Sequence, residues 1–212
     1  MSLSSLLNSS KPRILLATRN QAKARELSSL FSGEDWELTT LAQQGIKVEV
    51  SETGKTLEEN AVIKATTYAK ISNLITLADD SGLEIEALGG EPGPLSARYA
   101  GGGASDKERI ELILAKLADI PWRRRKARFR CVIAIATPTG ETKLCKGECQ
   151  GIIALEPKGE QGFGYDPIFY LPQKGKTMAE LSLKEKNKIS HRGKAARKAK
   201  QVLKRLISEI SS

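Results

Sequence analysis

The chain has 212 residues, 40% of them hydrophobic and 28% charged, and a formal net charge of +9 at pH 7. This composition is that of an ordinary soluble protein, and the length suits one sizeable domain or two intimate lobes. No apolar run approaches the roughly 18–20 residues of a membrane-spanning helix, so no such helix is expected.

Residues 1–10 (MSLSSLLNSS) have no basic start and no long apolar core, so we expect a flexible N-terminal extension, not a signal peptide. No repeat or long low-complexity linker divides the rest, and residues 11–212 are predicted to form a single domain. The three cysteines, Cys131, Cys145 and Cys149, are an odd set without a CxxC pair. They indicate reduced thiols in a cytoplasmic protein.

The positive charge is unevenly placed. Residues 173–212 hold 12 Lys/Arg against 3 Asp/Glu, which accounts for the whole excess. A second basic cluster spans residues 123–130. Such patches suit phosphate-bearing partners, either nucleotides or nucleic acid, although a solvated helix face is the alternative.

In the first half of the chain, short apolar runs alternate with helical periodicity. We expect strands over residues 13–17, 36–41, 46–50 and 75–78. We expect helices over residues 21–31 and 56–71, the second opened by a capping box of Thr56 and Glu59.

In the second half, hairpins dominate. Strands are expected over residues 83–88, 127–136, 142–149, 152–155 and 167–171, with a Gly- and Pro-rich loop over 89–105. Capping boxes predict a helix over 105–117 and a short helix after Thr177, and a basic amphipathic helix is expected over 191–210. The pattern indicates an α/β fold with a mixed sheet.

Two adjacent carboxylates, Asp79 and Asp80, end the apolar run 75–78 and are expected to open a turn at Gly82. Like charges side by side are costly unless something offsets them, and Mg²⁺ accepts carboxylate ligands together with substrate phosphates. Glu52, which follows the run 46–50, could meet the pair in space. The alternatives are a solvated turn at Asp79 and a solvated loop at Glu52.

Two further stretches suit a nucleotide. Residues 18–23 lead from a strand through a turn into a helix, and a helix start with a cation at Lys23 suits phosphate. Residues 162–167 (GFGYDP) place an aromatic between glycines, which suits stacking on a base. An ordinary helix start and a glycine turn covering the core are the respective alternatives.

A last polar stretch contains the only histidine, His191, between Ser190 and Arg192, with Lys186 one turn before. A lone histidine is more often structural than catalytic, but Arg192 beside it is a donor suited to phosphate or a base carbonyl.

As an ordered set, LADDSGL (77–83), GGEPG (89–93), SARY (96–99), GFGYDPIF (162–169) and SHRG (190–193) resemble the inosine triphosphatase family of non-canonical purine nucleoside triphosphate pyrophosphatases. The resemblance runs over nearly the whole chain. It implies a two-lobed α/β fold with a long central mixed sheet flanked by helices, a substrate cleft between the lobes, and a homodimer. It also implies Mg²⁺-dependent hydrolysis of ITP, dITP and XTP to the monophosphate and pyrophosphate.

Carried onto this chain, the resemblance implies a set of roles. Glu52 and Asp80 would hold Mg²⁺, Asp80 would activate the attacking water, and Ser81 would contact the substrate. The phosphates would be held by Thr18, Arg19, Asn20, Gln21, Ala22 and Lys23. The purine would be surrounded by Phe163, Gly164, Tyr165, Asp166, Lys186, His191 and Arg192.

One position departs from the family, which usually has Gly where Arg19 stands. Either the turn here uses an ordinary backbone conformation, or Arg19 points outward and adds a phosphate contact. The competing functions are a related pyrophosphatase with another base preference and a basic nucleic-acid-binding module. For the ITP, dITP and XTP pyrophosphatase that the resemblance implies, we expect a small-molecule nucleotide substrate, no stable nucleic-acid partner and no membrane contact.

Overall fold

The structure is a computed structural model that describes residues 11–211, so the predicted extension over residues 1–10 lies outside the described residues. Its centre is one mixed sheet in the order β2-β1-β3-β5-β6-β7-β8, with β4 added beside β3. The strands are β1 (Arg13–Leu16), β2 (Glu37–Thr40), β3 (Ile75–Ile85), β4 (Pro92–Gly93), β5 (Lys126–Ala136), β6 (Thr142–Ile153), β7 (Phe169–Leu171) and β8 (Lys176–Thr177). Strand β1 pairs in parallel with β2 and β3, and the remaining pairs are antiparallel.

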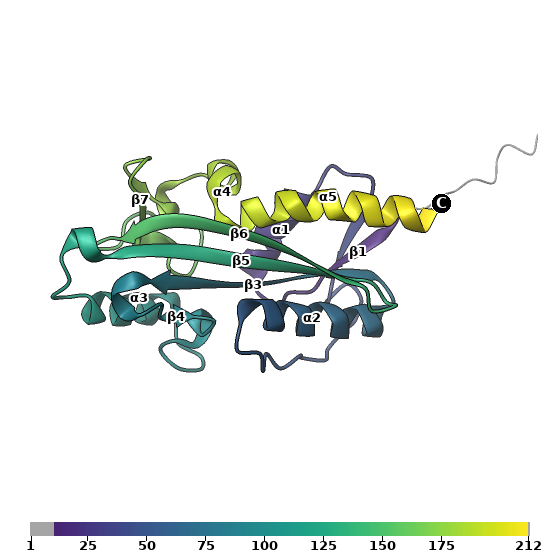
Figure 1. Ribbon diagram of the computed structural model, residues 1–212, viewed down its shortest axis with the longest axis horizontal. Coiled ribbons are helices and arrows are strands. Elements are labelled where there is room, and N and C mark those ends of the chain that lie inside the picture. Colours follow the sequence, from purple (N-terminus) through teal and green to yellow (C-terminus); the bar gives the residue numbers. More distant parts are fainter. Residues whose placement is uncertain (1–10, 212) are drawn as a thin grey trace, which may run out of the picture.

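Helices cover both faces of this sheet (Figure 1). They are α1 (Gln21–Phe31), α2 (Leu57–Ser72), α3 (Asp106–Lys116), α4 (Leu183–Ile189) and α5 (His191–Ser211). Helices α1 and α5 lie on one face, and α2 lies on the other (Figure 1). The prediction of an α/β fold with a central mixed sheet flanked by helices is confirmed.

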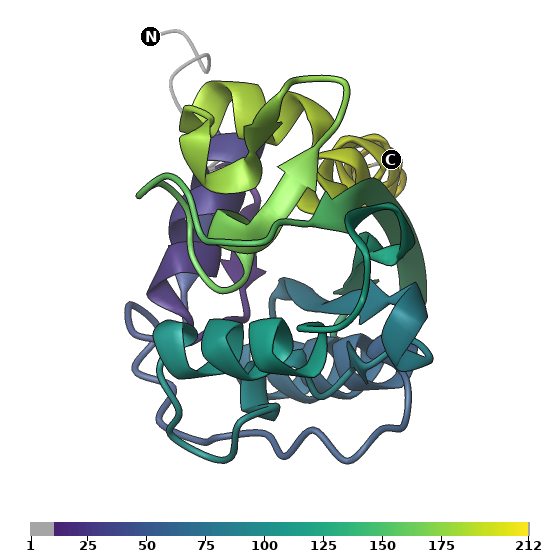
Figure 2. The ribbon, with the colours of Figure 1, turned by 90° about the vertical axis from the view of Figure 1, so that its left-hand side faces the viewer.

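The long strands β3, β5 and β6 connect two lobes. At one end, apolar side chains of α1 and α5 pack on one face of the sheet around Leu16. On the other face at that end, apolar side chains of α2, among them Ala65, form a second core. At the other end, a separate core gathers around Phe169, with contributions from α3, β5 and β7. Viewed from that end, α3 and the segment carrying β7 and α4 stand on opposite sides of the sheet's edge (Figure 2).

The turn expected at residues 79–82 is wrong, because β3 continues without interruption from Ile75 to Ile85. Strand β5 pairs with it along the whole length, from Thr76 opposite Ala136 to Ile85 opposite Ala127. This pairing provides hydrogen bonds for the backbone N–H and C=O groups of residues 79–82, which holds them in the strand although their side chains favour a turn. The close approach of β4 explains the glycine within the strand, because a Cβ at position 82 would overlap the main-chain oxygen of Gly93.

Other local expectations differ in detail. Residues 46–50 form no strand, and residues 152–153 belong to β6 instead of starting a new one. Residues 86–88 and 167–168, where strand was expected, lie in the 3₁₀ turns Glu86–Leu88 and Asp166–Ile168. Helix α4 was missed, although Ser182 and Glu185 form its capping box. The expected long hairpin and the helices near residues 21–31, 56–71, 105–117 and 191–210 are confirmed.

Candidate active site

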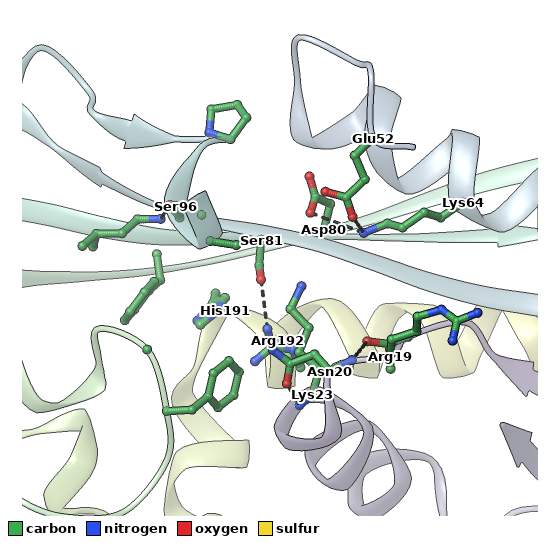
Figure 3. A pocket seen from close by; sticks show the side chains of 18 of the residues that line it. Arg19, Asn20, Lys23, Glu52, Lys64, Asp80, Ser81, Ser96, His191 and Arg192 are labelled. Atoms are coloured by element: carbon green, nitrogen blue, oxygen red, sulfur yellow. Dashed lines mark hydrogen bonds and ion pairs between the residues drawn. The ribbon is translucent and has the colours of Figure 1, made fainter. Parts of the chain in front are cut away.

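A single cavity gathers most of the polar side chains that the sequence singled out. It opens between α1 and α2 across the middle of β3, and reaches the loop before β7 (Figure 3). Its lining includes Thr18, Arg19, Asn20, Lys23, Glu52, Asp80, Ser81, Phe163, Gly164, Tyr165, Asp166, Lys186, His191 and Arg192. Gln21 and Ala22 are not among the lining residues, so any contact from them to a ligand there would come from the backbone of the helix start.

The two adjacent acids point to opposite faces of the sheet, as alternation along a strand requires. Asp79 faces α1 and α5, where its Oδ2 lies 3.2 Å from Lys23 Nζ and 3.2 Å from both Nε and Nη2 of Arg192. Burial alone would raise the pKa of Asp79, but Lys23 and Arg192 lower it below the ordinary value. Asp79 therefore carries a permanent charge that holds two cations in place.

Asp80 faces α2 and meets a different cation. Lys64 Nζ lies 2.7 Å from Glu52 Oε1, 3.4 Å from Asp80 Oδ1 and 2.7 Å from the main-chain oxygen of Asp79. Burial raises the pKa of Asp80 despite Lys64. The second oxygen of Asp80, Oδ2, has no hydrogen-bond partner among the described residues. Asp80 thus lines the cavity and carries a buried oxygen, Oδ2, that no described group of the protein satisfies.

This arrangement fits a hard cation that shares its coordination with a ligand. The described residues contain no group of three His, Cys, Asp or Glu side chains close enough to enclose a metal ion. Magnesium characteristically uses only one or two protein carboxylates and completes its shell with water and phosphate oxygens. Glu52 and Asp80 on one cation, with an unpartnered Asp80 Oδ2, provide that kind of incomplete site.

Across the cavity, the start of α1 presents groups suited to an anion (Figure 3). Asn20 is the N-cap and accepts a hydrogen bond from Lys23 N at 3.0 Å, while its own N–H donates to Thr18 Oγ1. A lysine in the first turn of a helix opposes the helix dipole. The contact of Lys23 with Asp79 offsets that cost and aims the ammonium at the cavity.

Arg19 adopts an ordinary backbone conformation, since Asn73 is the only non-glycine residue with positive φ in the described part of the chain. Its guanidinium extends away from Lys23 (Figure 3). The Nη2 atom donates to the main-chain oxygens of Ile46, Lys47 and Val48 at 3.3, 2.7 and 2.9 Å. The glycine usual in the family is therefore not needed for the turn here, and Nη2 of Arg19 donates to the protein backbone.

The far end of the cavity combines an aromatic ring with cations. Lys186 Nζ lies 4.9 Å and Arg192 Cζ 5.4 Å from the centre of the Phe163 ring. Asp166 accepts from Phe163 N at 2.9 Å and pairs with Lys186, which also contacts Glu26 Oε1 at 2.6 Å. Tyr165 is buried, and its hydroxyl donates to the main-chain oxygen of Ser96 at 2.8 Å. The loop is thus held at its base while the Phe163 ring faces the cavity.

His191 stacks on Phe129 with ring centres 4.6 Å apart. Burial, together with Arg192 and Lys186, lowers the pKa of His191 well below the ordinary value, so the imidazole is neutral. Its Nδ1 has no hydrogen-bond partner in the described part of the chain, and the residue lines the cavity. The neutral ring therefore leaves one buried nitrogen, Nδ1, without a partner among residues 11–211.

Arg192 is almost fully enclosed. It donates to Glu26 Oε2 at 2.6 Å and to Ser81 Oγ at 3.0 Å, besides its contacts with Asp79. Because Ser81 accepts from Arg192, its own O–H remains a donor toward the cavity.

Several residues of the site were missed by sequence reasoning, among them Glu26, Lys64, Ser96 and Arg109. Glu26 and Lys64 lie inside expected helices, where a charged residue is normally a solvated one. Spacing on the helix was the only signal that could have placed them on its inner face. Ser96 lies in SARY, one of the segments that carry the resemblance, but that segment was given no role.

Comparisons with known proteins identify the family of the chain. Residues 14–202 match the model of the Ham1 family. A Bacillus subtilis protein named dITP/XTP pyrophosphatase is 48% identical over 189 residues, covering 89% of this chain and 96% of that protein. The structure of the Staphylococcus aureus Ham1 protein superposes with a TM-score of 0.81 at 45% identity, covering 91% of this chain and 98% of that one. A Ham1 protein from Coxiella burnetii gives a TM-score of 0.83 at 43% identity, covering 92% and 99%. These matches confirm the resemblance read from the motifs, and the chain belongs to the Ham1 family.

Proposed function

We propose that this protein is a hydrolase of non-canonical purine nucleoside triphosphates, acting on ITP, dITP and XTP to release the monophosphate and pyrophosphate. Relatives nearly half identical over most of the chain carry the name dITP/XTP pyrophosphatase. The observation that carries the proposal is the order of groups along one cavity. Glu52 and Asp80 share Lys64, the start of α1 with Lys23 lies next to them, and the Phe163 ring with the cations of Lys186 and Arg192 lies at the far end.

The triphosphate lies across the middle of the cavity in this proposal. The N–H groups at the start of α1, with Lys23 and the Ser81 hydroxyl, hold its oxygens. Glu52 and Asp80 would hold Mg²⁺, which when bound neutralises phosphate charge and polarises the phosphoryl oxygens. Asp80 orients the attacking water and takes its proton, for which a raised pKa suits it better than the permanently ionised Asp79.

The base occupies the end lined by Phe163, His191 and Lys186. Stacking on Phe163 is worth about 1–3 kcal/mol and does not discriminate between bases. Selectivity rests on the purine O6, which is an acceptor in hypoxanthine and xanthine, whereas adenine carries an amino donor there. A cationic donor such as Lys186 can pair with O6. Opposite the amino group of adenine it would face another donor, so neither group would form a hydrogen bond and adenine binding is disfavoured.

We further propose that the enzyme is a homodimer in the cytoplasm. The resemblance of its motifs supports the dimer, and three free, buried cysteines suit a reducing compartment. None of the helices in residues 11–211 combines the length and the apolar character needed to cross a bilayer.

The test is product identification. Incubation with Mg²⁺ and dITP should release pyrophosphate and dIMP, and release of single orthophosphate would contradict the assignment. Asp80→Asn should lower kcat by about 10²–10⁴-fold, the usual contribution of a general base, while the protein remains folded. Asp35→Asn removes a carboxylate on the surface and is the matched control that should retain full activity.

A panel including GTP, ATP and modified pyrimidine triphosphates separates this function from a relative with another base preference. The structure offers little to a nucleic-acid-binding role for residues 123–130. Arg125 is buried, and Arg128 and Arg130 are paired with Glu84 at 2.6 and 2.9 Å. The basic cluster is therefore partly neutralised within the chain.

A further inference from the structure

The segment over residues 46–53 carries one of the two carboxylates of the site, yet it has little regular structure to hold it. It forms neither helix nor strand. In the described structure, none of the backbone N–H groups of residues 47–53 donates a hydrogen bond within the chain. Glu49, Val50 and Glu52 of this segment all line the cavity. The position of Glu52 must therefore be set mainly by side chains that reach the segment from elsewhere.

Two side chains reach its main-chain oxygens. Arg19 spans three consecutive carbonyls, those of Ile46, Lys47 and Val48. Tyr68 of α2 donates its hydroxyl to the Val48 oxygen at 3.0 Å. Arg19 comes from the turn that opens α1, immediately before the N-cap Asn20. One side chain thus connects the start of α1 to the segment that carries Glu52.

We propose that Arg19 is a positioning residue that clamps residues 46–48 to the start of α1 and thereby sets where Glu52 stands relative to Asp80 and Lys64. All three contacts come from one nitrogen, Nη2, at the far end of the side chain, so the clamp depends on the reach of arginine, which the shorter lysine side chain does not match. This inference rests on the proposed function for the role of Glu52, but the clamp itself is a statement about the fold.

The competing role for Arg19 is a direct contact with substrate phosphate, and the two roles predict different results for Arg19→Lys. A phosphate contact needs positive charge, which lysine retains. A clamp needs the terminal nitrogen to reach the three main-chain oxygens, and the shorter lysine side chain ends before them.

The first experiment is limited proteolysis of the full protein without nucleotide or metal. Trypsin can cut after Lys47, which is exposed on the clamped segment. Arg19→Lys and Arg19→Gln should both speed this cut about tenfold, the equivalent of losing one charge-assisted hydrogen bond. Arg123→Lys replaces an exposed arginine elsewhere and should leave the rate unchanged.

The second experiment measures Mg²⁺ dependence, directly by calorimetry and through dITP hydrolysis. Arg19→Lys should raise the half-saturating Mg²⁺ concentration by about three- to tenfold while the KM for dITP at saturating Mg²⁺ changes little. Unchanged cutting after Lys47 would overturn the clamp, as would a raised KM with an unchanged Mg²⁺ requirement. If the wild-type protein does not hydrolyse dITP, the proposed function fails, while the proteolysis still decides whether Arg19 is a clamp.

Discussion

Lys64 neutralises both Glu52 and Asp80, and its removal offers a quantitative test of how much this pairing stabilises the protein. In Lys64→Met, Glu52 and Asp80 lose the cation that lies 2.7 and 3.4 Å from their oxygens. Breaking a buried ion pair by removing one partner costs about 3–5 kcal/mol. The Asp80 side chain is 8% exposed but that of Glu52 is 31% exposed, so solvent screens part of the loss. We expect destabilisation at the lower end, about 3 kcal/mol.

The penalty should depend on pH with a definite sign. Burial already raises the pKa of Asp80, and loss of Lys64 removes the largest opposing influence, so the pKa rises further. A group whose folded-state pKa is raised contributes stability that is lost as pH rises through that pKa. Each additional unit is worth about 1.4 kcal/mol, so the variant's deficit should be smaller at pH 5 than at pH 8 by about 1 kcal/mol or more.

Equilibrium urea unfolding followed by circular dichroism measures both quantities. Lys70→Met, on an exposed position of the same helix, is the matched control and should change stability by less than about 0.5 kcal/mol. A Lys64→Met penalty below about 1 kcal/mol, or one that grows toward pH 5, would refute the reasoning from burial and pairing.

Two further predictions concern the base end of the cavity. The pKa of His191 is lowered in the folded protein, so the wild type loses stability as pH falls below the ordinary value of 6.5, where only the unfolded chain binds the proton. In thermal melts between pH 7.5 and 5, His191→Phe should therefore lose about 1–2 kcal/mol less stability than wild type. Parallel profiles of the two proteins would contradict this. Gly162→Ala should raise the KM for dITP about tenfold, because its φ is +78° and a Cβ would overlap Asp166 Oδ2. Gly164→Ala has a similar φ of +62° with nothing near its Cβ, so it is the control that isolates backbone strain, and equal effects would argue against a role for the overlap.

Much of the site was predictable because it is built from local signals. Asn20 and Lys23 stand at a helix start, where sequence patterns are strongest, and the ordered motifs, which include the two acids of LADDSGL, identified the family. The error at residues 79–82 had the same origin. A stretch of Asp, Ser and Gly reads locally as a turn, and only pairing with β5 along its length shows that it is strand.

By itself, the sequence determined the alternation of helices and strands, the capped helix starts and the chemistry gathered around Asp80. Local hydrogen bonding and side-chain periodicity encode these features directly. Only the tertiary structure decided which cation serves which acid: Lys23 and Arg192 on Asp79, and Lys64 on Asp80. It also decided that Arg19 reaches backbone 27 to 29 residues away. These contacts join elements distant in the chain, so their distances, burial and pKa shifts exist only after the sheet and its helices have packed.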